Sequence, residues 1–306
     1  MEEGSVSTVQ RWEDLNVDIL VKIFQLFDIF ELTSGIAHVC SSWRSAACDP
    51  ILWNTLDLST VESNFIKIPQ EPYVYVHARS HKTLTRLLKI SLSLSTGCIT
   101  NLIFHYNLYF NDEQLNYTAQ RSPRVRRLVM PAWNRIKIAA ICRAIRRWPE
   151  LVSMTMPSIT EPSYVMEEIS LSCQNFSQLK IMGPFGMIFA SSLTTYLPGL
   201  KVLSLQFSLV YKDALVHILD DLPQLEVLNI SHCVLLEINP PPFPRRIIKH
   251  THPVILSKAS RLREFYYCTN EFCIMCQRAR NDEGLMRWYK YEEGLWKSDA
   301  VKCLAL

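Results

Sequence analysis

Three cysteines near the C-terminal end of the chain have a spacing that can bind a metal ion. Cys268, Cys273 and Cys276 form a C-x4-C-x2-C pattern, and Cys303 can add a fourth thiolate. A structural zinc site uses four sulfur or nitrogen ligands, and it normally shows two closely spaced pairs. This chain has one such pair and scattered single cysteines, so buried and reduced cysteines are the favoured interpretation. The sequence therefore predicts no metal and no cofactor, and it leaves open whether this cluster binds zinc.

The residue patterns that usually mark an active site are absent from the sequence. Its eight glycines form no GxGxxG, GxxxxGK[ST] or GxSxG arrangement, and there is no HExxH. His77 and His81 lie four positions apart, as metal ligands on a helix do, but no third ligand lies near them in the sequence. We therefore expect no catalytic residue and a protein that is not an enzyme.

Seven arginines at 121–127 and 143–147 form the most basic part of the chain. Arginine clusters can contact the phosphates of nucleic acid. Most of these positions fall near expected helix ends, where the helix dipole favours a cation without any ligand. The formal net charge of +3 is also too small to attract a polyanion. We therefore expect no nucleic acid partner.

No stretch of the chain is apolar over the roughly 18 residues that a membrane-spanning helix needs. The first ten residues carry two glutamates instead of the basic flank and apolar run of a secretion signal. The ten cysteines are dispersed through apolar segments, which is typical of a reducing compartment. The sequence thus predicts no membrane partner and a location in the cytoplasm, the nucleus or both.

The N-terminal segment carries three apolar stripes at the helical period. They run from Leu15 to Phe27, from Leu32 to Trp43, and through a short stretch that ends at Trp53. Three short helices within about 45 residues have too little interior to bury all of these large side chains among themselves. Some of this surface must meet either the rest of the chain or a partner protein, and periodicity alone does not decide between the two.

The same segment resembles the F-box motif in the order and the spacing of its residues. The matching stretches are Trp12 to Phe24, Glu31-Leu32, Val39 to Arg44 and Leu52-Trp53. The family usually opens with Leu-Pro and a glutamate two residues later, whereas this chain has Leu15, Asn16 and Asp18. The missing proline leaves the start of the first helix as the point where the resemblance is weakest.

The resemblance implies that these helices bind the Skp-type adaptor of a Skp/cullin/F-box ubiquitin ligase, and through it the cullin. Recognition of this kind places an apolar helix face in a groove of the partner. The positions that match the family's adaptor-binding residues are Leu15, Ile19, Leu20, Ile23, Phe24, Val39, Cys40 and Trp43. A motif retained only as a structural cap is the alternative.

A Leu-x-x-Leu-x-Leu type of spacing recurs through the body of the chain. The copies begin at Ile99, Val125, Leu151, Phe176, Leu200 and Leu225, with steps of 26, 26, 25, 24 and 25 residues, and a step of 37 reaches Leu262. A period of about 20 to 29 residues with this motif resembles leucine-rich repeats, in which each unit adds a strand and a helix. Helices are expected between the strands at 112–119, 136–148, 165–173 and 212–219.

A doubly wound sheet also alternates strands and helices, but its units need neither a fixed length nor a repeated apolar triplet. The predicted fold is therefore α/β, with an N-terminal three-helix F-box followed by a short leucine-rich-repeat solenoid of about seven strand-helix units. A proline-rich insertion at 239–253 interrupts the repeats. It is expected to be a rigid surface loop, and a PxxP ligand is the alternative. The predicted boundaries are a flexible tail at 1–10, the F-box at 11–56, a connecting segment at 57–78, repeats at 79–270 with the insertion at 239–253, and a C-terminal cap at 271–306.

In such a solenoid the strands line the concave face, and side chains between the buried triplet members point into the groove because strand residues alternate between the two faces. The candidate substrate-binding residues are Arg127, Lys180, Gln206, Asn229, His232 and Tyr266. For any single one, an ordinary solvated sheet face explains its polarity equally well. The whole chain resembles plant F-box/leucine-rich-repeat proteins, which implies recognition of an unknown substrate protein for ubiquitination. A repeat scaffold without a ligase role is the alternative.

Overall fold

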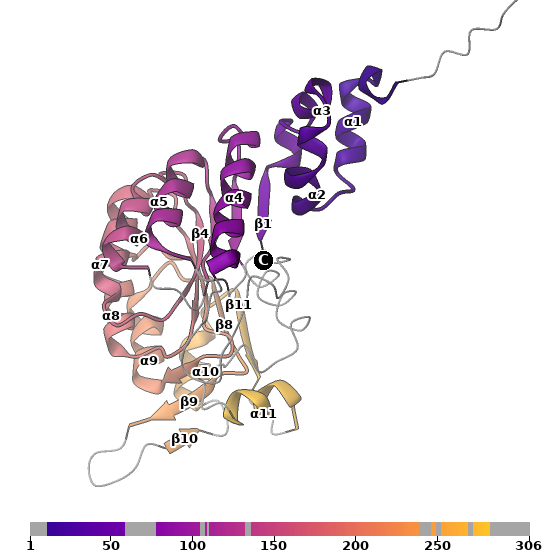
Figure 1. Ribbon diagram of the computed structural model, residues 1–306. Helices are drawn as coiled ribbons and strands as arrows, with labels where there is room; N and C mark the ends of the chain where they lie inside the picture. Colours follow the sequence, from indigo (N-terminus) through magenta and orange to yellow (C-terminus); the bar gives the residue numbers. More distant parts are fainter. Residues whose placement is uncertain are drawn as a thin grey trace, which may run out of the picture.

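The computed structural model describes residues 11–58, 78–104, 108, 110–131, 136–238, 246–248, 252–268 and 272–281. Within this part of the chain, a group of short helices at the N-terminal end is followed by a curved sheet with helices along one side (Figure 1). The predicted tail, most of the connecting segment, much of the proline-rich insertion and the cap beyond residue 281 lie outside the described residues. No helix of the described chain is long and apolar enough to cross a membrane.

The predicted F-box segment contains three α-helices and three 3₁₀ turns. The helices are α1 (Val17–Phe24), α2 (Ile29–Ser34) and α3 (Ser41–Ala46), and the turns are Trp12–Asp14, Ile36–His38 and Pro50–Leu52. Asn16, which replaces the family's proline, is the N-cap of α1, and its side chain accepts a 2.7 Å hydrogen bond from the backbone N–H of Asp18. Asparagine thus starts the helix by capping it.

The single helix predicted from Leu32 to Trp43 is wrong, because the chain forms two helices there. Gly35 ends α2, and Cys40 is in an extended conformation as the N-cap of α3, with its sulfur accepting from the backbone N–H of Trp43 at 3.5 Å. The apolar spacing continues across this break, since the short 3₁₀ turn between the two helices keeps a similar rotation per residue.

Eight parallel strands form the main sheet, in the order β1-β2-β3-β4-β5-β6-β8-β11. Their bounds are β1 (Thr55–Leu58), β2 (Asn101–Phe104), β3 (Arg127–Val129), β4 (Ser153–Pro157), β5 (Gln178–Met182), β6 (Val202–Ser204), β8 (Val227–Ser231) and β11 (Glu264–Cys268). The last seven coincide with the seven predicted apolar triplets, so the leucine-rich-repeat solenoid is confirmed. Strand β1 was not predicted, and it joins the F-box helices directly to the sheet by pairing with β2.

Helices cover one side of the sheet in succession (Figure 1). They are α4 (Ala78–Leu94), α5 (Asp112–Arg121), α6 (Ile138–Ile145), α7 (Pro162–Ser172), α8 (Met187–Tyr196), α9 (Lys212–Asp221) and α10 (Pro253–Ala259). The four predicted helices correspond to α5, α6, α7 and α9, and α6 is shorter than expected at both ends. Helix α11 (Ile274–Asn281) lies apart from this row and contacts the strand β9 described below.

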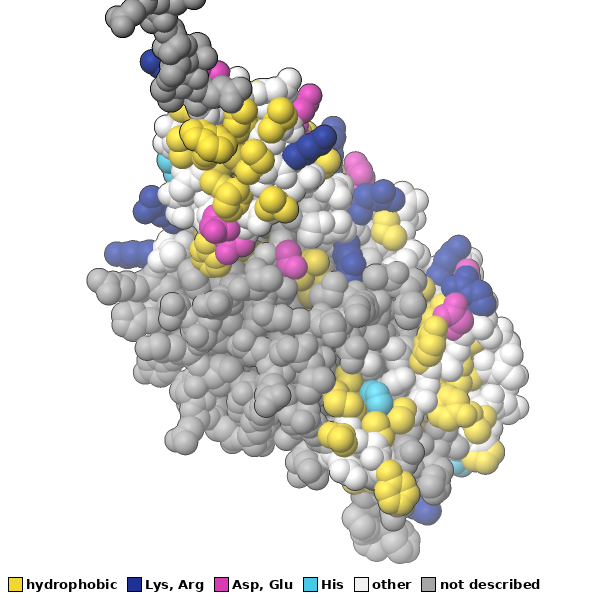
Figure 2. All heavy atoms as spheres, turned by 90° about the vertical axis from the view of Figure 1, so that its right-hand side faces the viewer, with side chains coloured by type: hydrophobic (Ala, Val, Ile, Leu, Met, Phe, Trp, Pro, Cys, Tyr) yellow, Lys and Arg dark blue, Asp and Glu magenta, His cyan; other side chains and the backbone are white. Residues whose placement is uncertain are grey.

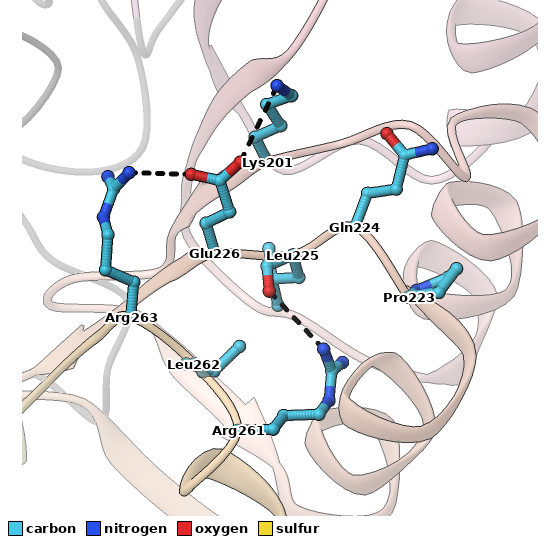
Figure 3. A pocket seen from close by; sticks show the side chains of 8 residues that line it. All are labelled: Lys201, Pro223, Gln224, Leu225, Glu226, Arg261, Leu262 and Arg263. Carbon is cyan, nitrogen blue, oxygen red and sulfur yellow. Dashed lines mark hydrogen bonds and ion pairs between the residues drawn. The ribbon is translucent and has the colours of Figure 1, made fainter.

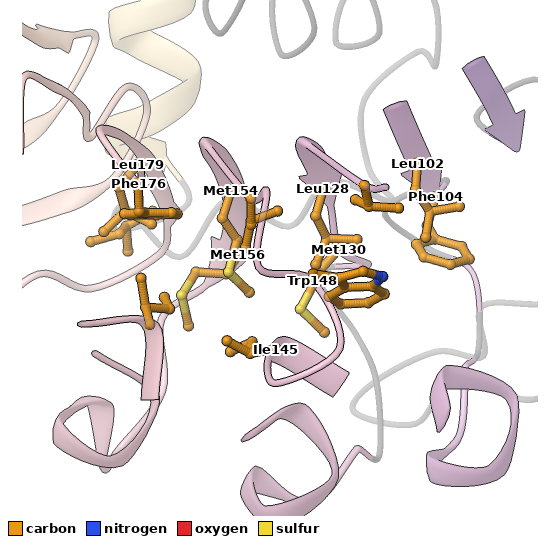
Figure 4. Close-up of a cluster of buried hydrophobic side chains, with 14 of the residues drawn as sticks. Leu102, Phe104, Leu128, Met130, Ile145, Trp148, Met154, Met156, Phe176 and Leu179 are labelled. Carbon is orange, nitrogen blue, oxygen red and sulfur yellow. The ribbon is translucent and has the colours of Figure 1, made fainter. Parts of the chain in front are cut away.

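The core lies between the sheet and the helix layer. Leu128, Met154 and Leu179 stand opposite one another on neighbouring strands, and Trp148 from the helix side packs beside them (Figure 4). The Trp148 indole N–H donates a 2.9 Å hydrogen bond to the carbonyl of Ser122, so this large side chain is buried without an unpaired polar atom. One buried cluster extends from Leu20 in the F-box segment to the last repeat.

A second, three-stranded sheet was not predicted. It consists of β7 (Leu209–Tyr211), β9 (Val234–Glu237) and β10 (Arg246–Ile248), with β7 parallel and β10 antiparallel to β9. The expectation of a plain loop at 239–253 is therefore wrong at β10 and at Pro253, where α10 begins. Residues 246–248, unlike proline, have backbone N–H groups, and this strand pairs with the edge of β9.

Candidate functional site

Exposed apolar side chains gather on the F-box segment, over the helices at the top of the molecule (Figure 2). We define the F-box apolar surface as the exposed residues Trp12, Val17, Ile19 and Val39. Trp12 is 69% exposed and Val39 is 60% exposed. Single exposed apolar residues are common on proteins, but a group of them on one short segment is typical of a binding surface.

The eight predicted adaptor-binding residues differ in their exposure. Ile19 and Val39 are exposed, whereas Leu15, Ile23, Cys40 and Trp43 are half-buried. Leu20 and Phe24 are buried in the core, so in this chain they support the exposed residues from within, and their contact with an adaptor stays a prediction. An apolar stripe one turn wide includes both the outward and the inward edge of a helix, and the sequence does not distinguish them.

Trp43 organises the F-box segment from within. The Trp43 ring packs edge-on against Phe24 with 5.4 Å between ring centroids, and its indole N–H donates to the carbonyl of Trp12 at 3.2 Å. This bond ties the start of the segment to α3 and holds Trp12 beside it. Trp12 and Val17 were not among the predicted adaptor residues, although both lie inside the matching motif.

The six candidate substrate-binding residues lie on or beside the inner face of the main sheet. Lys180, Asn229 and Tyr266 belong to one row across neighbouring strands, and Thr155 and Ser204 stand on either side of Lys180. Lys180, Gln206 and Asn229 are buried, Arg127 and His232 are half-buried, and Tyr266 is exposed.

The alternative of an ordinary solvated sheet face therefore does not describe Lys180, Gln206 and Asn229. The same row contains the apolar residues Ile103 and Val129, which form a small buried cluster of their own. Covering a face that carries apolar side chains at one end stabilises the fold, because those side chains leave water. Whether these residues contact a substrate stays a prediction.

Buried polar atoms are concentrated on this inner face. The hydroxyl oxygens of Ser153, Thr155 and Ser204 are buried without a hydrogen-bond partner among the described contacts. Burial lowers the pKa of the Arg127 guanidinium, and the Asp57 carboxylate works against this shift. The face thus combines a half-buried cation with hydroxyl groups that can still donate and accept hydrogen bonds.

A pocket of about 460 Å³ lies where the turns lead into β6, β8 and β11 (Figure 3). Its charges are paired: the Glu226 carboxylate contacts Lys201 at 3.7 Å and Arg263 at 2.8 Å. The Arg261 guanidinium donates to the carbonyls of Leu219 and Leu222 at the end of α9, at 2.9 and 2.8 Å. The bond to Leu219 satisfies a carbonyl near the helix end, where the residue four positions on is Pro223 and has no N–H, so the pocket is a structural joint between repeats.

His232 is directed toward cysteines instead of lying in the row of candidate substrate-binding residues. It follows β8 in a left-handed backbone conformation with φ of 58°, and its Nδ1 lies 3.3 Å from the sulfur of Cys276. Burial raises the pKa of the nearby Cys273 thiol, but backbone N–H groups of Cys276 and Met275 outweigh it, and this pKa lies below its usual value. The sequence pattern had not joined His232 to the cysteines, because it lies 36 residues before Cys268.

Comparison with known proteins agrees with this architecture. The sequence model of the F-box-like family matches residues 12–59. An F-box/LRR-repeat protein of Arabidopsis thaliana is 55% identical to this chain over 100% of the chain and 99% of its own length. A putative F-box protein of the same plant is 28% identical, with 98% of both chains covered, and putative F-box/LRR-repeat protein 22 is 24% identical over 72% of this chain and 69% of its own length.

The family match covers the segment that carries the exposed apolar residues, and the first of these relatives spans both the helices and the repeats. Identity of 55% over the full length extends well beyond a shared motif. This chain therefore belongs to the plant F-box/leucine-rich-repeat proteins.

Proposed function

We propose that this chain is the substrate-recognition subunit of a Skp/cullin/F-box ubiquitin ligase. The F-box segment binds a Skp-type adaptor and through it the cullin, and the repeats bind a target protein. The chain itself performs no chemistry in this role, because a separate conjugating enzyme carries the ubiquitin. Assembly takes place in the cytoplasm, the nucleus or both.

The observation that carries this proposal is the F-box apolar surface. Ile19 is 48% exposed and Val39 is 60% exposed, on a segment whose inner residues already fill the core. Burying the part of one such side chain that is still exposed contributes about 1 kcal/mol to association. The alternative of a structural cap requires the chain itself to cover this surface, whereas these two side chains remain about half exposed in the part of the chain that the structure describes.

Co-purification with a plant Skp-type adaptor tests the docking role. We expect the wild-type chain to bind, and the double variant Ile19→Asp/Val39→Asp to bind about 100-fold more weakly, because a carboxylate buried in an apolar groove loses its hydration. The matched control is Leu171→Asp/Ile188→Asp, since both residues are 71% exposed and lie on α7 and α8, away from the F-box. Circular dichroism checks that all three proteins are folded.

The outcomes separate ligase subunit from scaffold. A wild-type chain that fails to bind any Skp-type adaptor leaves a repeat scaffold without a ligase role. Equal weakening by the control pair would show that binding does not depend on the F-box apolar surface. Once docking is established, the Ile19→Asp/Val39→Asp variant is expected still to bind its target proteins but no longer to bring them to ubiquitination.

A further inference from the structure

Four potential metal ligands converge at the C-terminal end of the solenoid. They are His232, Cys268, Cys273 and Cys276, which we call the Cys3His cluster. One ligand atom from each side chain can be chosen so that all four lie within 4.8 Å of one another. The four residues come from three separate places in the fold: the turn after β8, the end of β11 and the start of α11.

Three of the separations between these atoms are close to those of a tetrahedral site. The Nδ1 of His232 lies 3.3 Å from the Cys276 sulfur and 3.5 Å from the Cys273 sulfur, and the Cys276 and Cys268 sulfurs are 3.6 Å apart. In a tetrahedron with ordinary zinc–sulfur and zinc–nitrogen bond lengths, two sulfurs are about 3.8 Å apart and a sulfur and a nitrogen about 3.6 Å apart. These three separations differ from the tetrahedral values by about 0.1–0.3 Å, and the other pairs lie within 4.8 Å, so the ligands close in by at most about 1 Å to hold the ion.

The backbone around His232 is arranged to hold its ring in this position. Both His232 and Phe207 have left-handed backbone conformations, with φ of 58° and 61°, and their rings stack at 4.9 Å between centroids. Such conformations are uncommon for bulky residues and persist where the surroundings over-determine them. The backbone N–H of His232 also donates to the carbonyl of Cys268 at 3.1 Å, which joins two of the ligands.

We infer that the Cys3His cluster is a structural zinc site. Three thiolates and an imidazole are soft and intermediate ligands that suit zinc, whereas magnesium and calcium require oxygen ligands. Four protein ligands fill the tetrahedral shell, so the ion has a structural role and no open position for catalysis. The sequence pattern offers Cys303 as the fourth ligand, and that residue lies outside the described residues; the fourth ligand in this cluster is instead a histidine from a different repeat.

The zinc ion links the last strand and the last described helix to the preceding repeat. The apolar attachment of α11 within the described residues is small: Ala279 is buried with Met182, Phe207, Val234 and Leu236, and Met275 packs against the same group. A short helix with so small an apolar contact is stabilised strongly by a metal ion that links it to the neighbouring strands. Because the site exists only in the folded chain, the free energy of zinc binding adds to the stability of this end of the solenoid.

Metal analysis of the purified full-length chain tests the inference. We expect one zinc ion per chain in the wild-type protein after reduction and reconstitution, and the same in Cys142→Ser, a control at a half-buried cysteine on α6. Cys273→Ser and Cys276→Ser are each expected to lose the ion. Chelation is expected to lower the melting temperature of the wild-type chain and to leave that of Cys276→Ser unchanged.

A second measurement on the wild-type chain decides the case where the serine variants fail to fold. Cobalt(II) in place of zinc is expected to give the visible bands of a tetrahedral complex together with sulfur-to-metal charge transfer. A wild-type chain that takes up neither metal overturns the inference, and so does zinc that remains in both folded serine variants. Intact mass measured without reductant checks the remaining possibility, since a disulfide between Cys268 and Cys276 would also overturn it.

Discussion

Thr155 and Ser204 flank Lys180 on the inner face of the sheet, and their hydroxyl oxygens are buried without a hydrogen-bond partner among the described contacts. A buried hydroxyl in this state costs about 1–3 kcal/mol. Thr155→Val keeps the shape of the side chain and removes the hydroxyl. We expect the free energy of unfolding to rise by about 1 kcal/mol, measured by urea denaturation of the purified chain.

Thr33→Val is the control for this substitution. The Thr33 hydroxyl is also buried, but it donates to the carbonyl of Ile29 at 2.7 Å, so its loss is expected to lower the free energy of unfolding by about 1 kcal/mol. If Thr155→Val is destabilising to the same degree, a bound water or polar ligand satisfies the Thr155 hydroxyl in solution. The idea of an unsatisfied row on the inner face would then be abandoned.

Two neighbouring residues of α1 are expected to behave differently when truncated. Leu20 is 1% exposed, so Leu20→Ala is expected to lower the free energy of unfolding by about 2–5 kcal/mol. Ile19→Ala leaves the core intact and is expected to weaken adaptor binding while the melting temperature changes little. Thermal unfolding and adaptor titration of both variants measure this difference, and equal melting temperatures would contradict the assignment of Leu20 to the core.

The identity of Ile19 and Leu20 as part of one apolar stripe was predictable, but their separate roles were not. Both are large apolar residues at positions that a helical period accepts. Which of them faces inward depends on where α3 packs, and that packing is set by the contact of Phe24 with Trp43 across the segment. The same limitation applies to Lys180, because a strand alternates its faces without specifying what covers each one.

Neighbouring helices of the repeats are joined by a charged pair whose effect depends on pH. The Arg146 guanidinium at the end of α6 donates to the Glu168 carboxylate on α7, with 2.7 Å between the closest nitrogen and oxygen. This bond, with a further one from Ser172, holds the pKa of Glu168 below its usual value although burial works against it. A carboxylate with a lowered pKa stabilises the fold above its unfolded-state pKa and loses that contribution as pH falls through the folded-state pKa.

Glu168→Gln tests this linkage. Above about pH 5 the variant is expected to be less stable than the wild-type chain, and the difference is expected to shrink as the pH falls toward 3. Urea denaturation across this range measures it. Glu161→Gln, at an exposed position just before α7, is the control and should show no such convergence. A constant difference between Glu168→Gln and wild type would mean that the charge of Glu168 does not contribute, because glutamine keeps the shape of the side chain and changes its hydrogen bonding.

Elements with a strong period were predicted well, and elements that depend on a partner were not. The repeated triplets predicted seven strands because each copy has the same apolar spacing and must stack on the next. The break between α2 and α3 was missed because Gly35 and Cys40 interrupt the helix without interrupting the apolar pattern. Strands β7 and β10 were missed because each has three residues and gains its stability only by pairing with β9.

The F-box segment and the repeats share one core, although the sequence divides them into separate units. Strand β1 pairs with β2 along four residues, and Leu56 and Leu58 of β1 are buried in the same cluster as Leu20 and Leu102. Helix α2 also contacts α4 of the repeat layer. A solenoid transmits stability between neighbouring units, so the first repeat and the F-box are expected to unfold together.

Leu56→Ala tests this coupling in the whole molecule. Leu56 is 1% exposed at the junction, and its truncation is expected to remove about 2–5 kcal/mol. Hydrogen exchange followed by mass spectrometry is expected to show reduced protection both in α1 and in β2, because opening either side exposes the shared core. Ile51→Ala, at a 61% exposed position close by in the sequence, should leave the protection of both elements unchanged.

If only α1 loses protection, the two parts fold independently, and docking of the F-box would not depend on the state of the repeats. If both lose protection together, a target that stabilises the first repeat also stabilises the helices that dock on the adaptor.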